Sequence, residues 1–199
     1  MVIYTMQYDS PIGSIVMAGD GESLTGLWFV GQKYFGSTLP GGEACAWNRE
    51  WSAEGLHKVC GGNLTEVREG ITENPHLPIF QTTKRWLDIY FRGEIPDSIP
   101  PLRMEGTPCR KAVWDILLSI PYGQTMTYGE IASKLAEQRG LPRMSAQAVG
   151  GAVGHNPISI IVPCHRVVGS DGSLTGYAGG VERKAALLAL EQSHIRSVH

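Results

Sequence analysis

The chain has 199 residues, of which 42% are hydrophobic, enough for the core of one large domain or two small ones. Its formal net charge of -2 argues against a strongly basic nucleic-acid protein, and no apolar stretch approaches the length of a membrane span. The N-terminus shows no secretion-signal pattern and the four cysteines include no CxxC pair, so we expect a cytoplasmic protein.

The charge is unevenly distributed along the chain. Residues 101–199 hold ten Lys and Arg against seven Asp and Glu, whereas residues 1–100 hold seven against twelve. A modest positive balance in the second half permits a small DNA contact surface with few phosphate contacts, without demonstrating one.

Three short stretches near the N-terminus have the composition of β-strands: residues 2–8, 14–18 and 24–30. Turn residues occupy positions 10–13, and Asp20 with the glycine after it is the strongest short hairpin signal in the chain. We therefore expect a small antiparallel sheet.

Residues 41–74 are polar, contain glycine pairs and show no sustained period, which predicts a loop insertion. Cys45, His57 and Cys60 lie in it and His76 lies just past it. Their spacing matches no standard zinc pattern, so we favour unconnected loop residues over a metal site and expect no metal.

Residues 78–91 are predicted to form a helix, because large apolar side chains recur there at helical spacing: Phe80, Trp86, Leu87, Tyr90 and Phe91. We interpret these side chains as a packed face rather than a cofactor site. Three prolines in residues 94–101 then predict a linker. It divides an N-terminal α/β domain, residues 1–97, from a C-terminal domain, residues 98–199.

The C-terminal domain is predicted to be mainly helical. Thr107 and the proline after it begin one helix, and a capping box from Thr127 to Glu130 begins a second that runs through Leu135. Ser145 caps a third helix, which ends near residues 156–157. The second and third form a helix-turn-helix with a long turn, and residues 181–191 form a final amphipathic helix. These elements predict an α+β fold.

The third predicted helix, residues 145–154, is almost free of long side chains. A helix that reads the major groove needs Arg, Asn or Gln on several turns, and this helix offers mainly alanine and glycine. Small residues allow close approach, which fits either tight helix packing or entry into the narrow minor groove.

An apolar run at residues 160–163 leads directly into Cys164 and His165. A cysteine beside a histidine is a candidate nucleophile with a candidate base, although a cysteine after an apolar run can equally be a buried small hydrophobic residue. Arg166 and the glycine-rich residues 169–180 favour a reactive site, because positive charge lowers the pKa of a thiol and glycines let a loop close on a ligand.

Seven motifs of the second half, in order and approximate spacing, resemble the O6-alkylguanine-DNA alkyltransferases. They are Ile120-Pro-Tyr-Gly123, Thr127-Tyr-Gly129, Ala148-Val-Gly-Gly-Ala152, Asn156-Pro157, Pro163-Cys-His-Arg-Val167, Gly176-Tyr-Ala-Gly-Gly180 and Glu191. The resemblance covers about residues 102–192. Residues 1–35 and 78–101 are similar to the N-terminal domain of bacterial members.

The resemblance implies DNA repair by direct reversal. Members flip a damaged guanine out of double-stranded DNA and pass its O6-alkyl group to a cysteine, here Cys164. His165 is then the base acting through a water, Glu191 orients His165, and Asn156 braces the pocket. A thioether is a poor leaving group, so each molecule acts once. We expect no cofactor and a monomer; acceptance of O4-alkylthymine stays open.

The resemblance also assigns the pocket and the DNA contact. Tyr128 donates to the flipped base, and the pocket is lined by Val167, Tyr177 and Ala178. In a strand, adjacent side chains point to opposite faces, so a water between Cys164 and His165 is the more comfortable geometry. The DNA-binding set is Ser145, Ala146, Gln147, Ala148 and Gly150.

Two departures from the family pattern leave alternatives open. Gln147 stands where members commonly carry an arginine that fills the gap left by the flipped base, and Arg143 is a candidate substitute. Residues 41–74 are not matched, and the turn before Gln147 is longer than in many members. A module that recognises alkylated DNA without accepting the group, and a cysteine hydrolase using Cys164 and His165, are the competing hypotheses.

Overall fold

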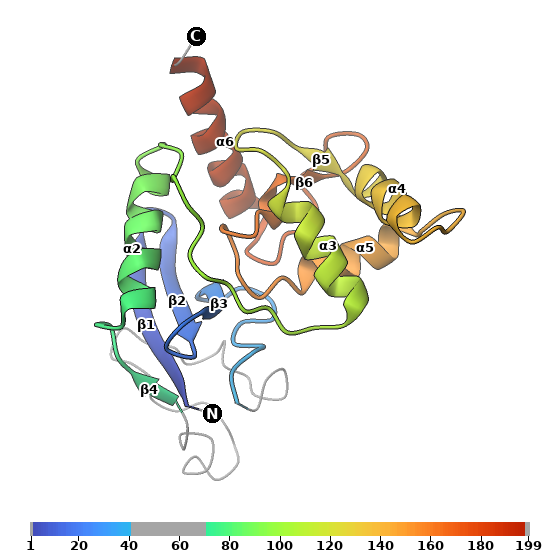
Figure 1. Ribbon diagram of the computed structural model, residues 1–199. Coiled ribbons are helices and arrows are strands. Elements are labelled where there is room, and N and C mark those ends of the chain that lie inside the picture. The colour runs from blue at the N-terminus through green and yellow to red at the C-terminus, as the bar shows by residue number, and fades with distance from the viewer. Residues whose placement is uncertain (1, 41–70, 198–199) are drawn as a thin grey trace.

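The computed structural model describes residues 2–40 and 71–197 (Figure 1). Its first half is a four-stranded sheet, ordered β3-β2-β1-β4, formed by β1 (Ile3–Ser10), β2 (Gly13–Gly19), β3 (Leu24–Phe29) and β4 (Ile71–Glu73). The antiparallel pairs β1–β2 and β2–β3 confirm the predicted hairpins, whereas β4 pairs with β1 in parallel.

The hairpin turns follow from local chemistry. Gly13 has a φ of 124°, a conformation that side-chain-bearing residues rarely adopt, and it ends the tight turn after β1. The Asp20 carboxylate accepts hydrogen bonds from the backbone N–H groups of Glu22 and Ser23, which holds the turn between β2 and β3.

The prediction of a loop over residues 41–74 is wrong for its last residues, because β4 belongs to the sheet. A three-residue strand is too short to show a period of its own, and its pairing with β1 is set by tertiary contact. Cys45, His57 and Cys60 lie outside the described residues. His76 is exposed, and no His, Cys, Asp or Glu cluster in residues 2–40 and 71–197 could hold a metal ion.

Helix α2 (Pro78–Phe91) covers one face of the sheet, as Figure 1 shows. Its first residue is a proline, whose fixed φ suits the first position of a helix. Its buried side chains, which include Phe80, Leu87 and Tyr90, pack with Ile15 and Met17 of β2, so the predicted packed face is confirmed.

The second half contains α3 (Pro108–Leu118), α4 (Tyr128–Gln138), α5 (Ala146–Gly154) and α6 (Val181–Ser197), with a small parallel pair of β5 (Met126–Thr127) and β6 (Val167–Val168). The predicted caps are present at the starts of α3, α4 and α5. Helices α4 and α6 extend beyond their predicted ends. The α+β fold is confirmed, and no helix among the described residues is long and apolar enough to cross a membrane.

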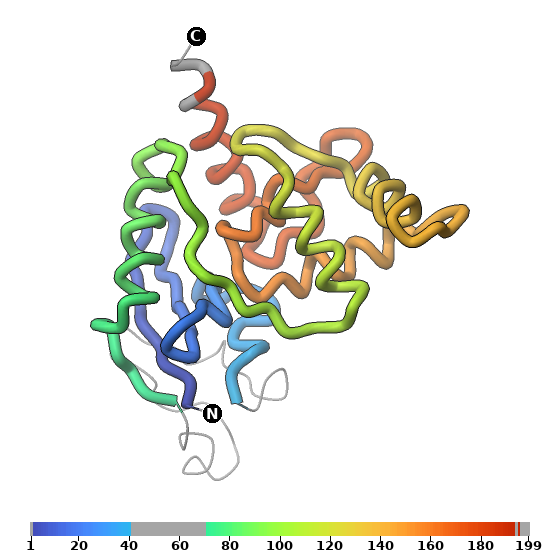
Figure 2. The backbone as a smooth tube through the Cα atoms, viewed as in Figure 1, coloured from blue at the N-terminus to red at the C-terminus, as the bar shows by residue number. Residues whose placement is uncertain are grey.

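Backbone pairing along the outer strand β3 joins the two halves. Leu24 exchanges hydrogen bonds with the backbone of Pro101 and Arg103, and Leu27 does so with Pro157 and Ser159. The connection between α2 and α3 runs past this edge as an extended segment (Figure 2). The β3 edge of the sheet is therefore covered by these segments. One apolar core continues from the sheet into the helical half.

Arg183 of α6 ties the same two halves together through its guanidinium. It donates to the carbonyl oxygens of Ile12 and Val30 in the first half and of Gly179 in the second. The guanidinium carbon also lies 4.8 Å from the centre of the Phe29 ring. The Arg183 side chain therefore connects the two halves through hydrogen bonds and through its contact with the Phe29 ring.

Replacing Arg183 with Lys should lower the free energy of unfolding by about 1–3 kcal/mol, because one ammonium cannot reach all three carbonyl groups in the planar geometry of a guanidinium. Urea denaturation followed by circular dichroism measures the change. Arg85→Lys, on the exposed side of α2, is the matched control and should be close to neutral. Equal midpoints for the two variants would contradict this role of Arg183.

Candidate active site

Cys164 lies in a single 3-10 turn, η2 (Cys164–Arg166), and not in the strand geometry assumed when its side chain was compared with that of His165. The preceding residues fold into a compact turn, in which Val162 N–H donates to the Ile158 carbonyl and Ile161 N–H to the Ser159 carbonyl. The argument that strand alternation separates Cys164 from His165 is therefore wrong. Even so, among the described residues no hydrogen bond joins the Cys164 thiol to the His165 ring.

Asn156 holds this turn and reaches the cysteine. Its side-chain oxygen accepts from Ile158 N–H, which fixes the orientation of the amide, and its Nδ2 donates to the Val162 carbonyl at 2.8 Å. The same Nδ2 lies 3.0 Å from Cys164 Sγ. The side chain thus supports the turn and donates to the sulfur at once.

Cys164 is 3% exposed, and burial raises the pKa of its thiol to about 11. The Asn156 hydrogen bond and the positive charge of Lys184 lower that pKa by less than burial raises it. Arg166, expected from sequence to activate the thiol, instead binds Glu191 and the Ile120 carbonyl. The resting sulfur is consequently a protonated thiol that needs a base.

His165 is fully buried, and burial lowers its pKa even though Glu191 opposes the change. Its Nε2 lies 2.7 Å from Glu191 Oε1. Because Glu191 is ionised, Nε2 carries the hydrogen of the neutral ring and Nδ1 holds the lone pair. Nδ1 is buried without a hydrogen-bond partner among residues 2–40 and 71–197, so it is available as an acceptor.

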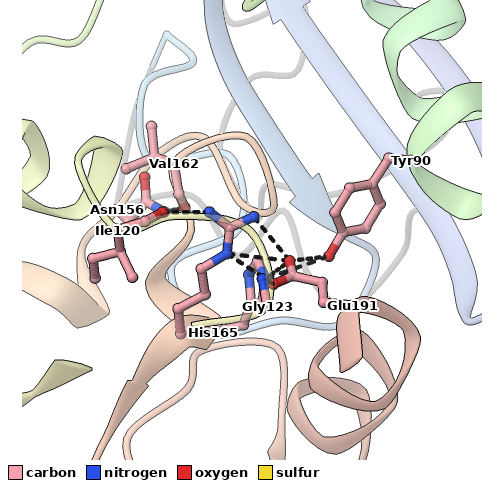
Figure 3. A network of polar contacts seen from close by, with 8 residues as sticks. Tyr90, Ile120, Gly123, Asn156, Val162, His165 and Glu191 are labelled. Carbon is pink, nitrogen blue, oxygen red and sulfur yellow. Dashed lines mark hydrogen bonds and ion pairs between the residues drawn. The ribbon is translucent and has the colours of Figure 1, made fainter. Parts of the chain in front are cut away.

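Glu191 of α6 is the centre of the polar network in Figure 3. Its two oxygens accept from Tyr90 O–H, His165 Nε2, the Arg166 guanidinium and Gly123 N–H. Burial raises the pKa of Glu191, but the hydrogen bonds from His165 and Arg166 and the positive charge of Arg166 together outweigh burial and bring the pKa to about 2. A fully buried carboxylate is thereby kept ionised beside a neutral imidazole.

Tyr128, the first residue of α4, lies at the edge of the glycine-rich loop. Its hydroxyl donates to the Thr175 carbonyl at 3.2 Å, and burial raises its pKa, so it remains a protonated donor. Gly176 has a φ of 82°, and a Cβ there would lie 2.4 Å from the Tyr128 hydroxyl oxygen. Glycine at position 176 therefore makes room for this tyrosine.

The other predicted pocket residues surround the same centre. Tyr177 is buried, and its ring is nearly perpendicular to that of His165, with ring centres 6.5 Å apart. Val167 is buried in β6, and the Ala178 carbonyl accepts from Lys33 N–H of the first half. Lys184, which sequence reasoning missed, donates to the carbonyls of Val167 and Thr175, and burial lowers its pKa to about 8. Its place within an amphipathic helix gave no signal of this contact.

The predicted DNA-binding residues form a separate surface on α5. Ser145, Ala146, Gln147 and Ala148 are exposed, whereas Val149, Ala152 and Val153 face inward. The interpretation as tight helix packing is confirmed for one face of α5, which lies on α3 and α4. The other face is open, and its entry into the minor groove stays a prediction. A Cβ at Gly150 would lie 3.9 Å from the Tyr128 ring, so α5 adjoins the pocket at that point.

A buried cysteine and an imidazole–carboxylate pair lie in the same half of the chain as the packed helices α4 and α5. The site thus has the parts of a cysteine nucleophile, and the helices are those predicted to bind DNA. Two family models match the chain. One, described as 6-O-methylguanine DNA methyltransferase, ribonuclease-like domain, matches residues 3–103; the other, the DNA binding domain of the same family, matches residues 108–193. The chain belongs to the 6-O-methylguanine DNA methyltransferase family, and residues 41–74 fall within the first match.

Individual relatives agree. A methylated-DNA–protein-cysteine methyltransferase of Mycolicibacterium paratuberculosis is 42% identical over 186 residues, covering 94% of this chain and 90% of the relative. One from Haemophilus influenzae is 38% identical over 191 residues, covering 96% and 87%. The crystal structure of Mycobacterium tuberculosis OGT in complex with DNA is 37% identical with a TM-score of 0.70, covering 98% of this chain and 94% of that chain.

The depressed pKa of Glu191 predicts acid sensitivity. Its contribution to stability is fully present above the ordinary value of 4.5 and is lost as the pH falls toward about 2, because the native partners disfavour the proton. Replacing Glu191 with Gln should flatten this part of the stability curve. Urea midpoints measured across the window test it, with Glu137→Gln on the exposed side of α4 as the control. An unchanged slope in Glu191→Gln would contradict the assignment.

Proposed function

We propose that the protein repairs DNA by moving the alkyl group of O6-alkylguanine to Cys164, once per molecule. The observation that carries the proposal is the buried Nδ1 of a neutral His165, which has no hydrogen-bond partner among the described residues and follows a cysteine whose thiol is protonated at rest. A single water between Nδ1 and the thiol would complete a route for the proton. Family membership supplies the substrate class.

The reaction balances with these groups. The sulfur–carbon bond forms as the bond between carbon and guanine O6 breaks, and the thiol proton passes through water to His165. Glu191 stabilises the imidazolium that results, because its negative charge lies 2.7 Å from Nε2. The released guanine takes a proton from the Tyr128 hydroxyl or from water, and His165 gives back through water the proton that it took from the thiol. The thiol proton is thus accounted for on the base, and no net charge is left.

Tyr128 is proposed as the donor to the leaving base. Its raised pKa keeps the hydroxyl protonated, and its hydrogen bond to the Thr175 carbonyl is one that a bound base can replace. Val167, Tyr177 and Ala178 would line the pocket around the base. Asn156 would hold the sulfur and its turn in place throughout.

DNA would bind through the open face of α5, where the side chains are small enough for entry into the minor groove. The target base would leave the stack and enter the pocket beside Tyr128, since the reacting carbon is otherwise shielded within the duplex. We extend the proposal to a monomer acting in the cytoplasm. The product thioether offers no leaving group, so no second step restores the thiol.

Mixing the protein with a duplex that carries one O6-methylguanine should add a single methyl group to Cys164, with no more protein modified than lesion supplied. Intact-protein mass spectrometry followed by peptide mapping measures both the site and the stoichiometry. Cys164→Ser should take up no methyl group, whereas Cys109→Ser, at the other described free cysteine, should react like the wild type.

Two outcomes would overturn the proposal. An unmodified wild-type protein that still binds the duplex would make it a damage-recognition module. Continuous turnover of a small ester at Cys164 would make it a cysteine hydrolase, because an acyl-enzyme is released by water and a thioether is not.

Gln147→Arg should tighten binding to duplex DNA by about tenfold, because an arginine adds a charge and a longer side chain on the open face of α5. Gel-shift titrations at one fixed salt concentration compare the variant with wild type. Thr82→Arg, at an exposed position of α2, makes the same change in net charge away from this face and serves as the control. Equal affinities for Gln147→Arg and wild type would show that position 147 does not fill the gap in the stack.

A further inference from the structure

Tyr90 is a buried residue of the first half whose hydroxyl lies inside the proposed relay of the second half. It comes from α2, and Figure 3 shows it converging with His165 on Glu191. The hydroxyl donates to Glu191 Oε1 at 2.7 Å and lies 3.3 Å from His165 Nε2. The same carboxylate oxygen lies 2.7 Å from Nε2, so the three atoms form a closed triangle.

The Tyr90 ring is held on several sides by aromatic neighbours. Trp86 stacks against it with ring centres 5.3 Å apart, and Phe91 and Tyr122 meet it edge-on. The ring is fully buried, so the position of its hydroxyl is set by packing and not by solvent. Burial, with Glu191 nearby, raises the pKa of Tyr90 well above its ordinary value, which keeps the hydroxyl a donor.

We propose that Tyr90 is a positioning residue, supplied by the first half of the chain, that fixes the His165–Glu191 pair in the tautomer and ring orientation that leave Nδ1 as the acceptor. The inference rests on the proposed function, because it assigns a role within that relay. Tyr90 touches neither the reacting sulfur nor the substrate. It acts by holding Oε1 and by occupying the space beside the Nε2 hydrogen, so the ring cannot turn without losing a hydrogen bond.

Removing the Tyr90 hydroxyl should change the pKa of His165 in a defined direction. With one donor fewer, Glu191 Oε1 becomes a stronger acceptor for the His165 N–H, so the imidazolium is stabilised and the pKa of His165 rises. The ring is also less firmly oriented, so productive geometry is adopted less often. Tyr90→Phe should therefore protonate His165 at higher pH and also slow transfer.

The experiment compares wild type, Tyr90→Phe and Tyr8→Phe. Tyr8 is the matched control, because its hydroxyl also crosses to α2, donating to Asp88 at 2.9 Å, but does not touch the relay. The first readout is the titration of His165 by nitrogen-15 NMR, which needs no lesion DNA. The second is the pH profile of single-turnover transfer from an O6-methylguanine duplex, with duplex affinity measured alongside.

For Tyr90→Phe we expect a higher His165 pKa, an acid limb of the rate profile displaced to higher pH, transfer slowed by about tenfold to a hundredfold, and unchanged duplex affinity. Tyr8→Phe should match wild type in all four. A purely structural role for Tyr90 would reduce the amount of folded protein without displacing the acid limb. An unshifted titration and rate profile in Tyr90→Phe would overturn the inference.

The two proposals fail separately. If wild type takes up no methyl group, the proposed function is wrong, while the His165 titration still tests Tyr90. If Tyr90→Phe does not fold, the wild-type protein provides the test: a slowly exchanging Tyr90 hydroxyl proton with a nuclear Overhauser contact to the His165 ring supports the role. A hydroxyl proton in fast exchange with solvent contradicts it.

Discussion

The buried negative charge of Glu191 is the constraint on which the site depends. A carboxylate removed from water is very unfavourable unless charges and hydrogen-bond donors surround it. Tyr90, Gly123, His165 and Arg166 meet this requirement, and they come from α2, from the turn before β5 and from η2. The relay can form only when these separate segments are packed together.

This constraint sets the protonation states of the groups around it. Arg166 forms an ion pair with Glu191, so its positive charge is offset and does not serve to lower the pKa of the Cys164 thiol. His165 stays neutral through burial, and the Cys164 thiol stays protonated for the same reason. A protonated thiol reacts poorly with stray electrophiles, so this arrangement favours reaction only where a base and a positioned substrate act together.

The first half of the chain contributes more than a scaffold. Lys33 N–H holds the Ala178 carbonyl of the pocket loop, and Arg183 links Gly179 of the same loop to the carbonyls of Ile12 and Val30. Together with Tyr90, these contacts connect the sheet and α2 to both the loop and the relay. The continuous core between the halves makes that connection rigid.

Much of the fold was predictable because its signals are local: the caps of α3, α4 and α5, the β1–β2 hairpin and the helical spacing in α2. Cys164 and His165 were identified from their adjacency as a candidate nucleophile and base, and Glu191 through the family resemblance. The structure brings His165 and Glu191 into contact. Tyr90 and Lys184 were missed, because each reaches its partner only through tertiary packing. The strand geometry assumed for Cys164 and His165 failed for a related reason, since side-chain hydrogen bonds of Asn156 hold the preceding apolar run in a turn.

The state of the His165 ring is the most direct test of this account, and nitrogen-15 NMR of the imidazole in the wild-type protein measures it. The account predicts a neutral ring at pH 7, with the hydrogen on Nε2 and a lone pair on Nδ1. A charged imidazolium at that pH, or a neutral ring with the hydrogen on Nδ1, would contradict it, because Nδ1 could then not accept the thiol proton.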